Sequence, residues 1–238
     1  MTIDEDGHEA DAEAFAPGSD AATDGGAPAE RDAAAYRELG RLDPRFAELA
    51  VRLGTPDPFH FPDGGRTTES NFAGMVMHIL AQQIATRVAL VLYDRLVAAT
   101  GGTPTPESLL RLDVDQLKAI GTSHSKATYL RALAEAVASG GLDIERLDAV
   151  GDAEVESSLT AITGIGPWSA EMFLIHQLRR ADILPAGDLG IRTAVQRLDA
   201  LTAVPSIEEV RRRGAAWSPY RTYAAALLWR SLAPAVSG

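Results

Sequence analysis

From Asp43 onward the sequence follows one pattern, in which apolar residues recur at helical spacing between glycines, prolines and capping residues. One such segment has apolar side chains at Phe72, Met75, Val76, Ile79 and Leu80. This spacing places the side chains on one face of a helix. Alternating apolar and polar residues, which would predict strands, are absent. The chain is therefore expected to be all-α, with about ten to twelve short helices joined by short connections.

Local signals predict individual helix ends. The dipeptide Asp43-Pro44 is typical of an N-cap followed by a first-turn proline, and Gly54 is typical of the end of the same helix. Ser206 and Glu209 have the spacing of a capping box, which predicts another helix start.

Acidic residues are concentrated at the N-terminal end. The chain has 33 Asp and Glu against 22 Lys and Arg, a formal net charge of −11, and residues 1–40 hold 11 of the acids and two arginines. Residues 1–38 have almost no large apolar side chains, so we expect a disordered acidic tail there and a folded unit over 39–238. The folded unit is near neutral, so a nucleic-acid partner would have to bind a local face. The tail could instead compete with DNA for that face.

Other classes of protein are excluded by what the sequence lacks. No cysteine is present, so disulfides, thiolate zinc sites and cysteine-ligated iron–sulfur clusters cannot form. The five histidines show no metal-ligand spacing. No apolar run is long enough for a membrane span and no targeting segment is recognisable, so we expect a cytoplasmic protein.

The segment from Leu159 to Leu198 carries the candidate chemistry. It reads as an apolar helix, the turn Gly164-Ile165-Gly166, and a second helix that starts at Pro167. Glycines permit positive φ, and the exposed N–H groups of such a turn can bind a phosphate. Two glycines in a turn also occur at ordinary helix corners, so the turn alone does not decide between the two interpretations.

Asp188 follows later in the same segment, at the predicted start of another helix. Free N–H groups and the helix dipole stabilise a carboxylate at that position. Such an anion can stabilise an oxocarbenium-like sugar or align an attacking water. Asp is also a frequent N-cap with no further role, which is the alternative interpretation.

Taken together, several motifs resemble the helix-hairpin-helix DNA glycosylase superfamily, in particular its 3-methyladenine DNA glycosylase branch. The resemblance covers about residues 43–232. The matching segments, in order, are Ile79-Leu80-Ala81-Gln82-Gln83-Ile84, Gly121 with Ser125-Lys126-Ala127, Gly164-Ile165-Gly166-Pro167-Trp168, Leu184-Pro185-Ala186-Gly187-Asp188-Leu189-Gly190-Ile191-Arg192, and Trp217-Ser218-Pro219-Tyr220-Arg221 with Trp229.

The resemblance implies a two-lobed helical fold with a cleft between the lobes. The middle lobe would span about 69–185, and the second lobe would combine about 43–68 with 186–232. It also implies hydrolysis of the N-glycosidic bond of alkylated purines in base excision repair, with Asp188 as the catalytic residue. The target base would leave the duplex and enter the cleft.

The resemblance also assigns a base pocket. Trp168 and Trp229 match its aromatic positions, where an indole face would attract a cationic alkylated base. In the bifunctional, endonuclease III-like branch a lysine that forms a Schiff base stands in place of Trp168, so the chain is expected to lack lyase activity. Met172 and Leu189 stand where tyrosines can occur; Met172 could equally be helix packing.

The DNA-binding residues implied by the resemblance are Gly164, Ile165, Gly166 and Gln83. Gln83 would fill the gap left by the flipped base, although a capping or exposed glutamine is the alternative. The backbone carbonyls of the family's hairpin can hold a structural Na⁺ or K⁺, which here would fall on Thr160, Ile162 and Ile165. No other cofactor is implied. For Glu171, in the second hairpin helix, a surface position is favoured over an approach to the site.

The sequence thus predicts a monofunctional, monomeric glycosylase that acts on double-stranded DNA with damaged bases, in the cytoplasm and associated with the nucleoid. Two alternatives remain: a non-catalytic helix-hairpin-helix DNA-binding protein, and a glycosylase for deaminated or mismatched bases.

Overall fold

The computed structural model describes residues 26–233, and this part of the chain contains helices and no strand, which confirms the all-α prediction. The α-helices are α1 (Gly26–Leu42), α2 (Pro44–Leu53), α3 (Asn71–Ala81), α4 (Thr86–Thr100), α5 (Pro106–Leu110), α6 (Val114–Ala119), α7 (His124–Ala138), α8 (Asp152–Thr160), α9 (Pro167–His176), α10 (Leu189–Leu198), α11 (Ile207–Gly214) and α12 (Arg221–Arg230). Two 3-10 helices complete them, η2 (Ile144–Ala149) and η3 (Ala215–Trp217).

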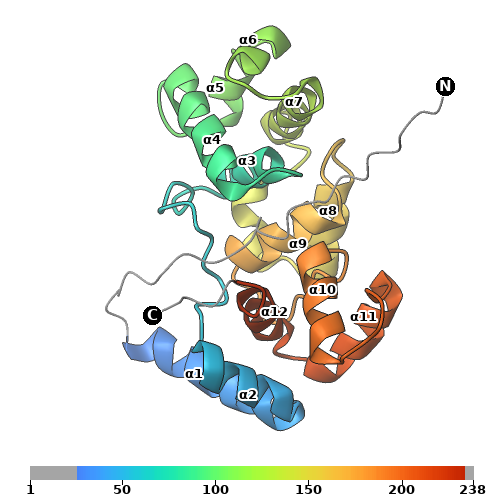
Figure 1. The fold of residues 1–238 in the computed structure, drawn as a ribbon. Coiled ribbons are helices and arrows are strands. Elements are labelled where there is room, and N and C mark those ends of the chain that lie inside the picture. Colours follow the sequence, from blue (N-terminus) through green and yellow to red (C-terminus); the bar gives the residue numbers. More distant parts are fainter. Residues whose placement is uncertain (1–25, 234–238) are drawn as a thin grey trace, which may run out of the picture.

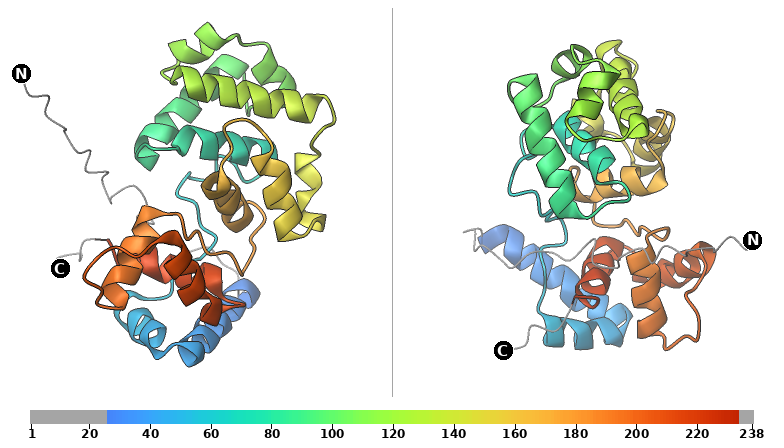
Figure 2. Two further views of the ribbon diagram at one scale, coloured as in Figure 1. Left: turned by 90° about the vertical axis from the view of Figure 1, so that its right-hand side faces the viewer. Right: turned by 45° about the horizontal axis from the view of Figure 1, so that its top comes forward.

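The helices gather into two groups, which Figure 1 and Figure 2 show from three sides. Helices α3 to α9 form the first group, and α1, α2 and α10 to α12 form the second. The chain passes between the groups through two loops, 54–70 and 177–188. Buried apolar side chains of both groups belong to one hydrophobic cluster. The second loop joins α9 of the first group to α10 of the second and ends at Asp188. The position of Asp188 therefore depends on how the two groups pack together.

The prediction of a disordered tail over 1–38 is wrong for residues 26–38, which belong to α1. This helix packs on α2 and α12. Ala35, Tyr36 and Leu39 share one face and are buried, and the Tyr36 hydroxyl donates to the Pro56 carbonyl at 2.8 Å. The alanine-rich composition that suggested disorder also has the highest helix propensity, and a few buried side chains are enough to select the helix. Residues 1–25 lie outside the described part.

The helix starts predicted from caps are confirmed at Asp43 and Ser206. Asp43 accepts from the backbone N–H of Arg45 and caps the start of α2 as predicted. Its carboxylate also accepts from the Arg213 guanidinium at 2.6 Å and from Trp217 Nε1 at 3.2 Å. The cap therefore also ties α2 to the α11–η3 segment.

No helix within 26–233 is long and apolar enough to cross a lipid bilayer.

Candidate active site

The turn between α8 and α9 is held in its shape by contacts from α7 and from Gln82, which directly follows α3. Gly164 has a φ of 89°, in the left-handed region, and a Cβ there would lie 2.0 Å from Cγ of Tyr129 on α7. The Gly164 carbonyl accepts from Gln82 Nε2 at 2.9 Å, and the same amide nitrogen donates to Ser169 Oγ at 2.9 Å. Only glycine fits at this position, both for its φ and for the approach of the tyrosine ring.

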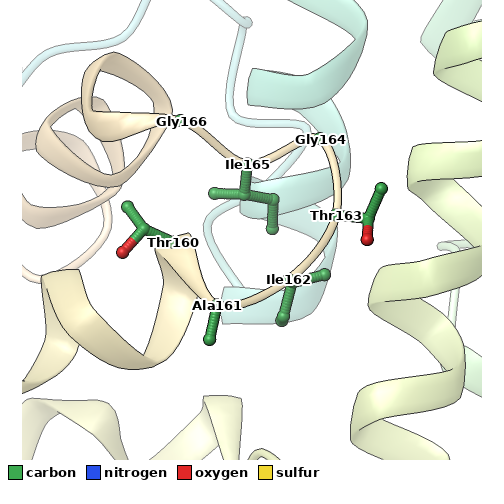
Figure 3. Close-up of a pocket in the computed structure, with 7 residues that line it drawn as sticks. All are labelled: Thr160, Ala161, Ile162, Thr163, Gly164, Ile165 and Gly166. Carbon is green, nitrogen blue, oxygen red and sulfur yellow. The ribbon is translucent and has the colours of Figure 1, made fainter.

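The turn forms an open pocket lined by residues 160–166, drawn in Figure 3. The backbone N–H groups of Thr163, Gly164 and Gly166 donate to no acceptor within the described residues. Unpaired N–H groups of this kind suit a phosphate oxygen. Thr160, Ile162 and Ile165 also line the pocket, and the monovalent-cation site on their carbonyls remains a prediction.

Asp188 is the N-cap of α10, as predicted, and its carboxylate is held by three N–H donors. Oδ1 accepts from the backbone N–H of Ile191 at 2.9 Å and from Trp229 Nε1 at 3.0 Å, and Oδ2 accepts from Trp168 Nε1 at 3.0 Å. Trp168 lies in the first turn of α9 and Trp229 near the end of α12. Three helices therefore bring together the three residues that the resemblance singled out.

The two tryptophans differ in exposure. Trp168 is half-buried, whereas Trp229 is only 4 % exposed. A small pocket beside Trp229 is lined also by Pro58, His60 and His176, so the loop between the two groups contributes to this wall. The sequence pointed to none of these three residues as part of a pocket.

Met172 and Leu189 lie in opposite environments. Met172 is completely buried in the core, which favours helix packing for its side chain. Leu189 is 46 % exposed and follows Asp188 directly. A pocket role for either side chain remains a prediction, and Leu189 is the one whose surface is accessible.

Gln83 lies exposed between α3 and α4 with a φ of 56°. A non-glycine residue in the left-handed region is uncommon, and such strain is often found at functional positions. Its neighbour Gln82 is bonded to the hairpin, and Lys126 Nζ donates to the Leu80 carbonyl at 2.7 Å near the end of α3. These hydrogen bonds restrain the end of α3 and the residue that follows it. Gln83 is therefore exposed next to a restrained backbone segment beside the hairpin.

Glu171 was expected at the surface, but the structure places it half-buried on α9, one turn after Trp168. Burial raises the pKa of Glu171 to about 8, the charges of Glu156 and Asp188 act in the same direction, and Arg211 opposes them. The folded protein therefore favours the neutral carboxyl. The sequence contains no signal of this, because the burial of a side chain depends on how the helices pack in three dimensions.

This raised pKa predicts a pH-dependent stability. The folded state favours protonated Glu171, so its contribution is present below pH 4.5, its ordinary value, and is lost as the pH rises through about 8. A Glu171→Gln variant has no such loss. We expect it to be as stable as the wild type near pH 5 and more stable by ~2 kcal/mol at pH 9, after allowance for partial exposure of the carboxyl. Urea unfolding of both proteins from pH 5 to 9 measures the difference; a difference that does not change with pH would contradict the assignment.

Comparison with known proteins places this site in a family. The sequence profile of the HhH-GPD superfamily of base excision DNA repair proteins matches residues 76–219. The chain belongs to this superfamily. The matched span contains the hairpin, Trp168 and Asp188, and Trp229 lies beyond its end.

Individual members of the superfamily match most of the chain. A protein named DNA-3-methyladenine glycosylase 1 from Schizosaccharomyces pombe is 30% identical over 196 residues, which are 81% of this chain and 84% of that protein. A solved structure of a Schizosaccharomyces pombe 3-methyladenine DNA glycosylase in complex with abasic DNA has a TM-score of 0.76 at 29% identity, covering 86% of this chain and 99% of that one. A DNA-3-methyladenine glycosidase from Bacillus halodurans has a TM-score of 0.69 at 30% identity, covering 83% and 88%.

Proposed function

We propose that the protein is a monofunctional DNA glycosylase that hydrolyses the N-glycosidic bond of alkylated purines in double-stranded DNA. The observation that carries the proposal is the carboxylate of Asp188, held at the start of α10 against an indole of the hairpin's second helix. Its relatives in the HhH-GPD superfamily, named as DNA-3-methyladenine glycosylases, support the substrate class.

Each group of site residues has a separate role in such a reaction. The free N–H groups of the 160–166 pocket bind a phosphate of the damaged strand, and Gln83 occupies the space that the flipped nucleotide leaves. The base lies against the tryptophans. As the bond from C1′ to the purine nitrogen breaks, the base takes the bonding electrons and positive charge develops on the sugar. The Asp188 anion stabilises that charge, and a water oxygen then bonds to C1′ and gives one proton to the solvent.

Trp168 supports the absence of a lyase step. A covalent route through the sugar aldehyde requires an amine at the site, and an indole nitrogen cannot form a Schiff base. We propose that the protein acts as a monomer in the cytoplasm, on DNA with damaged bases.

A panel of duplexes tests this function. We expect the purified protein to release methylated purines from alkylated DNA and to leave abasic sites, with little release from duplexes carrying deaminated or mismatched bases. Free bases are measured by chromatography, with protein-free incubations as the control for spontaneous loss. Preferred release of deaminated or mismatched bases would replace the substrate class, and binding without any release would favour the non-catalytic DNA-binding protein.

Borohydride added to the same reactions tests the monofunctional assignment. We expect no covalent protein–DNA adduct on a denaturing gel, because no lysine occupies the place of Trp168. A trapped adduct would show that another amine of the protein attacks the sugar.

A further inference from the structure

The acceptor capacity of the Asp188 carboxylate is nearly filled in this structure. A carboxylate has about four acceptor positions, two on each oxygen. Oδ1 uses two of them, for Ile191 N–H and Trp229 Nε1–H, and Oδ2 uses one, for Trp168 Nε1–H. The remaining acceptor position therefore lies on Oδ2.

We propose that Trp168 and Trp229 are positioning residues for Asp188, whose indole N–H groups fix the carboxylate so that Oδ2 presents its one free acceptor position to the sugar or the attacking water. This role rests on the proposed function and adds to it. It is distinct from contact with the base, because it acts through the ring nitrogen rather than through the ring face.

The cap hydrogen bond alone would not achieve this orientation. A bond from Ile191 N–H to Oδ1 restrains one oxygen, and Asp188 is partly exposed, so the other oxygen could rotate into solvent. The two indoles reach the carboxylate from α9 and α12, and each meets a different oxygen. Donors from three elements therefore define the plane of the carboxylate, which is the preorganisation that electrostatic catalysis requires.

The third tryptophan of the chain provides an internal comparison. Trp217 is fully buried, and its Nε1 donates to Asp43 at 3.2 Å. It thus makes the same kind of bond in another part of the protein, to a carboxylate that the reaction does not use. Any variant that changes Asp188 should therefore change the NMR signals of the Trp168 and Trp229 indole N–H groups. It should leave the Trp217 signal unchanged.

Indole signals in a proton–nitrogen NMR spectrum test the contacts without reference to activity. In an Asp188→Ser variant the serine still caps α10 but is too short to reach the indoles. We expect the Nε1–H signals of Trp168 and Trp229 to move upfield and to exchange faster with solvent, with Trp217 unchanged. Unchanged Trp168 and Trp229 signals would overturn the inference.

Single-turnover kinetics test the positioning role. Trp168→Phe and Trp229→Phe keep an aromatic ring and remove the donor. We expect each to slow base release on the order of tenfold to a hundredfold, with binding of abasic duplex unchanged within about twofold. In an Asp188→Asn background the same substitutions should cause no further loss, because they act through Asp188.

The remaining outcomes identify which proposal fails. Weaker binding with an unchanged rate would mean that the indoles serve only to hold DNA, and an equal further loss in the Asp188→Asn background would mean that they act on the base directly; either overturns the positioning role. A wild-type protein that releases no base would overturn the proposed function and this role together. If the wild-type protein releases base normally but the tryptophan variants fail the tests above, only the positioning role is overturned.

Discussion

Replacement of Asp188 by Asn is expected to slow the release of methylated purines by about 10²- to 10³-fold, because the neutral amide cannot stabilise the positive charge that develops on the sugar. The fold should be retained, since Asn is as good an N-cap as Asp and can still accept from Ile191 N–H. Release of free base at saturating protein is the measurement, with the spontaneous loss from the same DNA subtracted.

A second aspartate cap serves as the matched control. Asp113 caps α6 and accepts from the backbone N–H of Gln116 at 2.8 Å in an exposed setting. The Asp113→Asn variant should release base at the wild-type rate and melt at nearly the same temperature. If Asp188→Asn also keeps the wild-type rate, Asp188 is only a helix cap and another group of the protein supports base release.

Replacement of Gly164 by Ala is expected to destabilise the protein by ~2–4 kcal/mol and to weaken binding of abasic duplex by at least about tenfold. Two costs combine: a left-handed φ that disfavours a side chain, and a methyl group that would lie 2.0 Å from the Tyr129 ring. The turn must shift to avoid this clash, and the N–H groups that we propose bind the phosphate would shift with it. Urea unfolding and fluorescence anisotropy with labelled duplex measure the two effects.

The other glycine of the hairpin is the control for this substitution. Gly166 has a φ of −93°, and a Cβ there meets no atom within 4 Å. Gly166→Ala should therefore change stability by less than about 1 kcal/mol and keep its N–H group in place. A double variant, Gly164→Ala with Tyr129→Ala, should recover part of the lost affinity. Equal behaviour of the two single alanine variants would contradict the steric argument.

The sequence predicted those features that depend on neighbouring residues. Asp43 and Ser206 cap helices because cap chemistry is local, and the glycine turn with Asp188 is recognisable because its motif lies within one short segment. The helical class followed from periodicity in the same way. Helix α1 was missed because its alanine-rich sequence is compatible with helix or disorder, and the burial of Tyr36 and Leu39 against α2 and α12 selects the helix.

The electrostatics of the site could not be predicted in this way. The raised pKa of Glu171 depends on its burial and on the charges that Glu156 of α8 and Arg211 of α11 bring near it in the fold. The indole bonds to Asp188 likewise join residues 20 and 41 positions apart, and composition does not reveal which way a ring nitrogen points. Met172 is a position that the resemblance matched to the base pocket, and the structure shows its side chain completely buried. The sequence did not reveal that burial.

The bonds at Asp188 also have a mechanical consequence. Trp168 belongs to the first group of helices, whereas Trp229 and the capped α10 belong to the second. The Asp188 carboxylate accepts hydrogen bonds from both groups and so connects them. A rotation of one group against the other would stretch the bond between Trp168 and Asp188. The angle between the two groups of helices and the position of the Asp188 carboxylate are thereby coupled, and a substitution at Asp188 weakens this connection as well as removing the negative charge.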